Sequence, residues 1–190
     1  LVMNCRDYVQ RHRRIYDGLH MRWLTFTIFT YLMLAAEIGL GPLIEIRVAT
    51  LATRPSLMLI LLVYVACSAP PMVVAWAALI IGTLIDAKNI SCPIFGPTAL
   101  GSLLGAYTTL QFRTVFLRDS ALTFASMTFI TGVFLHLTNA FFLSIHDLIY
   151  PDDDWFALND LVRNFFDLVY TIGVSIPLAV LLKKVESLWA

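Results

Sequence analysis

The chain has 190 residues, of which 59% are hydrophobic and 14% are charged, whereas soluble domains are about 45–50% apolar and about 25% charged. This composition excludes a disordered chain and argues against a water-soluble monomer, because few polar side chains remain to cover a surface. The 13 basic and 13 acidic residues cancel, so we expect no general attraction to nucleic acid. The length allows one domain.

Apolar segments separated by short polar stretches organise the chain, and we expect each segment to be a helix. The longest one, residues 56 to 85, would make a helix of about 45 Å, which is too long for one span of a hydrocarbon core near 30 Å. Pro70 and Pro71 lie in its middle, and a double proline removes two helical donors, so we divide it there. The expected helices cover residues 23 to 43, 56 to 69, 71 to 86, 96 to 112, 121 to 146 and 161 to 182.

The distribution of basic residues tests this count of helices. With six spans and a cytoplasmic N-terminus, nine basic residues fall inside and four outside, which fits the positive-inside rule. A single span over residues 56 to 85 would give seven against six. We therefore expect an all-α integral membrane protein, a bundle of six transmembrane helices with both termini cytoplasmic, and keep five helices as the alternative. The nine inside residues are Arg6, Arg11, Arg13, Arg14, Arg22, Arg113, Arg118, Lys183 and Lys184.

Three regions differ in character along the chain. Residues 1 to 20 are polar and basic, without the features of a cleavable signal. They are either an arm that binds anionic lipid or a translated upstream stretch, because Met21 lies just before the first span. Residues 21 to 184 form a single polytopic membrane domain, and residues 185 to 190 form a short cytoplasmic tail.

The chain lacks the common signatures of catalytic and cofactor sites. Cys5, Cys67 and Cys92 have neither CxxC nor Cys/His metal spacing, so we expect no structural disulfide and no metal. The sequence contains no Walker motif, GxGxxG, GxSxG or HExxH. We therefore expect no catalytic residues and no cofactor.

The most patterned part of the chain joins the third and fourth expected helices. The run GTLID begins at Gly82 and ends at Asp86, and the run FGP follows at Phe95, Gly96 and Pro97. An acid at the end of an apolar helix caps the following turn, pairs with a nearby lysine, or offers a charge to a partner protein. These alternatives stay open, and all five residues are candidates for helix packing or partner binding.

Two further glycines, Gly101 and Gly105, extend this pattern along the fourth helix. Their spacing makes a small-xxx-small pair, which lets a neighbouring helix approach closely without a hydrophobic driving force. We expect them to serve packing.

Polar residues inside the expected spans are few. His136 and Asn139 fall on one stripe of the fifth helix, and Glu37 lies inside the first helix, where it is expected to pair with one of them or to reach the interface. These three residues are candidates for a polar cavity. If an intramembrane enzyme were built on His136, removing its imidazole would abolish function without lowering abundance.

These residues resemble the MreD family of bacterial rod shape-determining membrane proteins. The match rests on the GTLID run, the segment from Phe95 to Leu100 and the Ala-Pro-Pro break before residue 72, and it covers about residues 21 to 182. The chain departs from the family pattern at Thr83, in its polar first twenty residues and in the acidic loop at residues 151 to 160.

The resemblance implies a multi-pass protein of the bacterial cytoplasmic membrane, a non-enzymatic scaffold of the cell-elongation machinery. Its implied partners are membrane lipid, MreC-like and MreB-like proteins, and a cell-wall polymerase or transpeptidase. The family is similar in architecture to the six-helix substrate-binding subunits of vitamin transporters. The alternative is therefore a solute-binding subunit that holds a small molecule among Glu37, His136 and Asn139.

Overall fold

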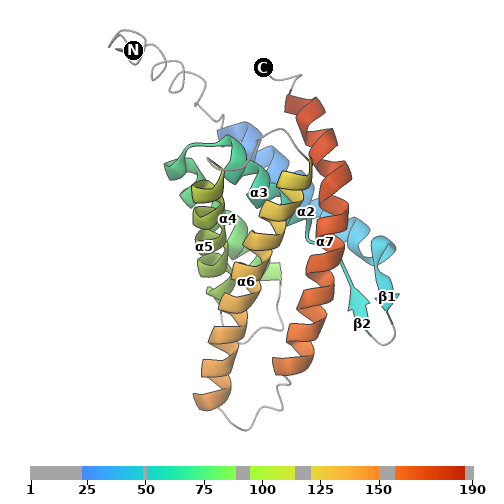
Figure 1. Ribbon diagram of the computed structural model, residues 1–190, viewed down its shortest axis with the longest axis vertical. Helices are drawn as coiled ribbons and strands as arrows, with labels where there is room; N and C mark the ends of the chain where they lie inside the picture. Colours follow the sequence, from blue (N-terminus) through green and yellow to red (C-terminus); the bar gives the residue numbers. More distant parts are fainter. Residues whose placement is uncertain (1–22, 49–50, 89–94, 114–120, 150–156, 187–190) are drawn as a thin grey trace.

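A computed structural model describes residues 23–48, 51–88, 95–113, 121–149 and 157–186 (Figure 1). All six expected helices are present in this part of the chain, with ends close to the expected ones. The elements are α2 (Trp23–Ile44), β1 (Ile46–Val48), β2 (Leu51–Thr53), α3 (Leu57–Ser68), α4 (Pro71–Lys88), α5 (Pro97–Phe112), α6 (Ala121–Ile149) and α7 (Ala157–Glu186).

The division of the long apolar stretch at the proline pair is confirmed. Helix α3 ends at Ser68, where the N–H of Ala69 still donates to the carbonyl oxygen of Val65 at 2.8 Å. Helix α4 begins at Pro71, the first helical position, where a proline loses no hydrogen bond.

A short β-hairpin between α2 and α3 is an addition to the expected all-helical fold. Strand β1 pairs antiparallel with β2, and Ile46 lies opposite Thr53. The Thr53 hydroxyl donates to the Ile46 carbonyl oxygen at 2.8 Å, which closes the open end of the hairpin. Each strand has only three residues, which is too short for an alternation of polar and apolar side chains to predict a strand from the sequence.

The helices run alternately up and down, so that α2 starts and α7 ends at the same end of the bundle (Figure 1). Four of the described helices, α2, α4, α6 and α7, are long and apolar enough to cross a membrane. Helix α3 has 12 residues and measures about 18 Å, well short of a hydrocarbon core near 30 Å.

Helix α3 lies at the centre of the bundle and contacts all five other helices. It is apolar on every side, and Met58, Ile60, Leu62, Val63 and Ala66 are completely buried. A helix that is hydrophobic all round is stable only where protein or lipid surrounds it, and here the surroundings are the other helices. Packing inside the bundle is how this short helix avoids the mismatch with the bilayer.

Glycines set the close approach of α4, α5 and α6. A Cβ added at Gly82 would lie 2.5 Å from the Cα of Ala99 on α5, and one added at Gly101 would lie 3.0 Å from the Cα of Leu135 on α6. One turn further along α5, a Cβ at Gly105 would lie 2.9 Å from the carbonyl oxygen of Thr131. The backbones therefore touch at positions where any larger residue would force the helices apart.

We expect Gly82→Ala to lower the free energy of unfolding by roughly 1–3 kcal/mol, the usual effect of overpacking, because the new methyl group meets the backbone of Ala99 as well as the Ser102 hydroxyl, and the backbone cannot move aside as a side chain can. The matched control is Gly173→Ala on α7, whose Cβ would have nothing within 4 Å. Survival of the folded peak in size-exclusion chromatography after heating in detergent compares the two. Equal midpoints would show that the glycine contacts do not limit stability.

Candidate functional site: two carboxylates at buried helix starts

Asp86, in the last turn of α4, caps the start of α5 from outside that helix. Its side-chain oxygens accept hydrogen bonds from the backbone N–H groups of Gly96 at 3.0 Å, Thr98 at 3.3 Å and Ala99 at 3.3 Å. The N-cap residue Gly96 has no side chain for this task, so the first N–H groups of α5 need another acceptor. The carboxylate also carries the charge that a helix N-terminus favours.

The order of residues around this cap follows from its geometry. Gly96 has φ of 119°, a left-handed conformation that favours glycine, and Pro97 occupies the first turn of α5. Phe95, just before them, is 68% exposed, while Asp86 is only 7% exposed. The Asp86 carboxylate is therefore engaged inside the protein, whereas the Phe95 side chain is exposed.

Glu37 on α2 performs the same task at the start of α3. One of its oxygens, Oε2, accepts a hydrogen bond from the backbone N–H of Met58 at 2.8 Å, and the other, Oε1, lies 2.6 Å from the ammonium group of Lys88. The hydroxyl of the N-cap residue Ser56 accepts a weaker bond from the N–H of Leu59 at 3.4 Å. The carboxylate thus joins three helices: α2, α3 and α4.

Arg113 supplies the opposite charge at the other end of α3. From the C-terminus of α5, its guanidinium donates to the carbonyl oxygen of Ala69 at 2.7 Å and to that of Ala66 at 3.4 Å. A cation is favourable at the negative end of the helix dipole. The central helix therefore has an acid at its start and a base at its end, both contributed by other helices.

Two polar side chains of α7 bind the backbone where the chain enters α3. The backbone N–H of Arg54 donates to the carboxylate of Asp167 on α7 at 2.9 Å, and the N–H of Ser56 donates to the Thr171 hydroxyl at 3.0 Å. The Arg54 guanidinium pairs with Glu45 at 2.8 Å through its Nε. Sequence reasoning missed Asp167 and Thr171, because hydrogen bonds across more than 100 positions leave no local pattern.

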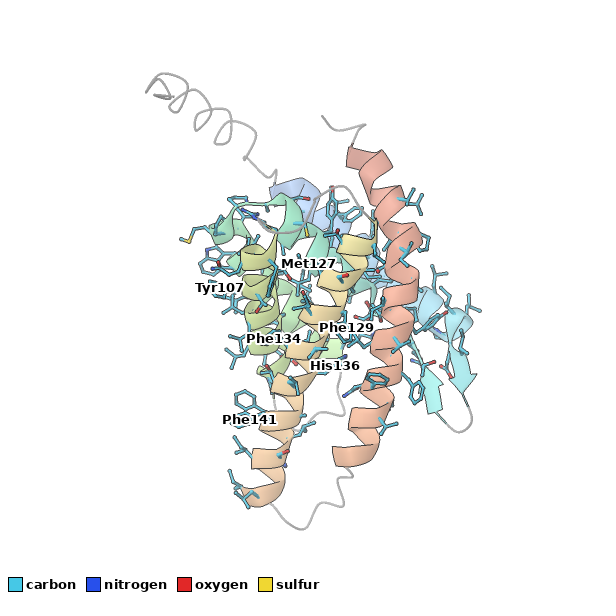
Figure 2. All side chains as sticks on the ribbon, in the orientation of Figure 1. Tyr107, Met127, Phe129, Phe134, His136 and Phe141 are labelled. Atoms are coloured by element: carbon cyan, nitrogen blue, oxygen red, sulfur yellow. The ribbon has the colours of Figure 1, made fainter. Side chains whose placement is uncertain are left out.

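The three candidates for a polar cavity have separate surroundings. The amide of Asn139 donates to the Thr98 hydroxyl at 3.1 Å, which ties α6 to the start of α5, and Glu37 faces Lys88 and α3. His136 lies near the middle of α6 (Figure 2), and its Nδ1 is buried with no hydrogen-bond partner among the described residues. Within the part of the chain that the structure describes, no hydrogen bond joins these three side chains.

No group of three or more His, Cys, Asp or Glu side chains among the described residues has the arrangement of a metal site. The chemistry that this part of the molecule does show is hydrogen bonding to helix ends.

We expect Asp86→Leu to destabilise the fold strongly, because three backbone donors at the start of α5 lose their acceptor and two of them, at Thr98 and Ala99, are in buried residues. Each unpaired donor costs about 1–3 kcal/mol. Asp86→Asn keeps one acceptor oxygen and should retain part of the stability. Thermal midpoints in detergent check the order, which a milder effect of leucine than of asparagine would contradict.

A double-mutant cycle tests the pair between Glu37 and Lys88. Glu37→Leu leaves an ammonium group and a buried N–H without their partner, and we expect a loss of about 3 kcal/mol. Lys88→Met leaves the carboxylate buried and unpaired. The double variant should be more stable than the sum of the single losses predicts, by about 1–3 kcal/mol. Additive losses, measured by chemical unfolding in mixed micelles, would show that the two groups act independently.

Comparison with known protein families identifies the family to which the chain belongs. A family model described as rod shape-determining protein MreD matches residues 18–185, which confirms the resemblance in the sequence. Neither the curated proteins nor the solved structures yielded a match. Because the family model covers nearly all of the 190 residues and the described helices include four that are fit to cross a membrane, the chain belongs to the MreD family of rod shape-determining membrane proteins.

Proposed function

We propose that this protein is a non-enzymatic scaffold of the cell-elongation machinery in the bacterial cytoplasmic membrane. In this role it couples MreC-like and MreB-like proteins to the polymerase and transpeptidase that build peptidoglycan. Family membership supports a role in rod shape, and the proposal extends that role to a mechanism: the chain presents surfaces on which partners assemble.

The observation that carries the proposal is that the two buried carboxylates bind the ends of other helices. Glu37 and Asp86 are each 7% exposed, and both accept hydrogen bonds from backbone N–H groups at the starts of other helices, Glu37 with one oxygen and Asp86 with two. Buried carboxylates that are hydrogen-bonded to backbone N–H groups stabilise a shape, whereas general acid–base catalysis would require them to lie within reach of a substrate proton. The surface that remains for partners is largely apolar.

The proposed orientation places both termini in the cytoplasm. The start of α2 and the end of α7 lie at the same end of the bundle (Figure 1), and basic residues concentrate at this end in the sequence. Arg113, at the end of α5, belongs to the same set. Cytoplasmic loops carry an excess of Lys and Arg, so the opposite end, with Asp86 and Phe95, faces outward.

We assign partner binding to the outward end of α4 and α5, with Phe95 as its contact. The bonds from Asp86 to Gly96, Thr98 and Ala99 hold the start of α5 in place, so Phe95 is presented from a fixed backbone. A large exposed aromatic side chain next to rigid backbone is a typical anchor of protein interfaces. In this proposal, Gly82, Pro97, Gly101 and Gly105 keep the helices beneath it together, and Asp86 positions it.

Phe95→Ser should abolish capture of the MreC-like partner and fail to restore rod shape in cells depleted of the chain, with unchanged abundance. The matched control is Phe141→Ser on α6, because Phe141 is 62% exposed, close to the 68% of Phe95, and projects away from the bundle (Figure 2). This control should retain capture and shape. Co-purification and cell morphology measure both outcomes.

Undiminished capture by Phe95→Ser would overturn the assignment of this end as the partner surface. Native mass spectrometry of the parent protein adds a second criterion. A small molecule retained by the parent and lost from His136→Leu would favour the solute-binding alternative, because the buried Nδ1 of His136 lacks a partner among the described residues.

A further inference from the structure

The helices of the bundle differ greatly in length at the outward end. Helices α6 and α7 have 29 and 30 residues, or about 44 and 45 Å, whereas α5 has 16 residues, or about 24 Å. The Asn139 side chain meets Thr98 at the start of α5, so the remaining turns of α6, down to Ile149, continue beyond it. Figure 1 shows α6 and α7 extending below the other helices.

The chain enters α3 beside the middle of the apolar segment of α7. The N–H of Ser56 is bonded to Thr171 at 3.0 Å, and Thr171 lies near the middle of Val162–Leu181, the apolar segment of α7 that is fit to span. Just before it, the N–H of Arg54 is bonded to Asp167, which lies about 8 Å inside the end of that segment at Val162. The hairpin lies beside the lower half of α7 (Figure 1).

Hydrocarbon is an unsuitable medium for this hairpin. A two-stranded sheet leaves backbone N–H and C=O groups unpaired along its outer sides, and lipid-exposed open sheets do not occur within the hydrocarbon region. The Arg54 side chain, 55% exposed, also carries a charge there beside Glu45. Both features require water or headgroups at the depth of Asp167.

The opposite face of α7 requires hydrocarbon at that same depth. Asp167, Tyr170 and Thr171 face the hairpin and its flanks, through bonds to Arg54, Ile44 and Ser56. At 100° per residue, Phe165 and Val169 point the other way, and they are 55% and 50% exposed. One depth of the molecule therefore meets polar groups on one side and large apolar side chains on the other.

We propose that the bilayer is thinned beside the hairpin, so that headgroups and water reach Arg54, while it keeps its full thickness against the far face of α7. A short hydrophobic surface is accommodated by local thinning at a modest cost, and here only one side of the protein is short. The surface formed by the hairpin, Glu45 and Arg54 thus has the lipid headgroup layer as its partner. This inference rests on membrane location alone and is independent of the proposed scaffold role.

Cysteine labelling at matched depth tests the proposal. In the full chain with Cys5, Cys67 and Cys92 changed to serine, single cysteines replace Arg54 or the 48% exposed Ile46 on the hairpin, and Val169 on the far face of α7. A membrane-impermeant maleimide is applied to right-side-out and inverted vesicles. We expect Arg54→Cys and Ile46→Cys to be labelled from one side, and Val169→Cys to be unlabelled until detergent is added.

Two results would overturn the proposal. Labelling of Val169→Cys in intact vesicles would show that the lower half of α7 lies outside the membrane on all sides. In that case the exposure of the hairpin would require no local thinning of the bilayer. Protection of Ile46→Cys and Arg54→Cys together would place the hairpin in hydrocarbon. Ile46→Cys keeps Arg54 and its bonds, so its result stands even if Arg54→Cys fails to fold, and labelling in sodium dodecyl sulfate verifies that every thiol reacts.

Discussion

The structure depends on how the two ends of the buried helix α3 are satisfied. A helix leaves four N–H groups and four carbonyl groups without partners inside itself, and in α3 several of these groups belong to buried residues, such as Met58 at its start and Ala66 near its end. Each buried polar group left unpaired there would cost several kcal/mol. Glu37 accepts a hydrogen bond at the start of α3 and Arg113 donates one at its end, and each carries a charge of the sign that its end of the helix dipole favours.

The last turn of α4 links the capped start of α3 to the start of α5. Asp86 and Lys88 are two residues apart, and residues at that spacing point to different sides of a helix. Asp86 therefore reaches the start of α5, while Lys88 reaches across to Glu37 at the start of α3. One turn of one helix thus positions both short helices, and a change at either residue reaches the packing of all of α2 to α5.

Hydropathy and proline positions were enough to predict the helices, because both act locally. The cap by Asp86 was also foreseeable as one of three alternatives, since the acid precedes a Gly-Pro helix start by ten positions. The partners of Glu37 and Arg113 were not, because they lie 21 to 51 positions away for Glu37 and 44 for the shorter Arg113 bond. Such contacts are decided by which helix becomes central, and apolarity alone did not single out α3.

Helix association in lipid explains why a few charged residues are enough to hold the bundle in one arrangement. In lipid, apolar side chains gain little by leaving one apolar medium for another, so helix association rests on close packing and hydrogen bonds. The glycines at positions 82, 101 and 105 supply the close packing, but close contacts alone permit sliding along a helix axis. Bonds to helix ends have fixed positions along that axis. Glu37, Asp86 and Arg113 therefore set the register of the helices, and the scaffold role that we propose requires that register to be unique.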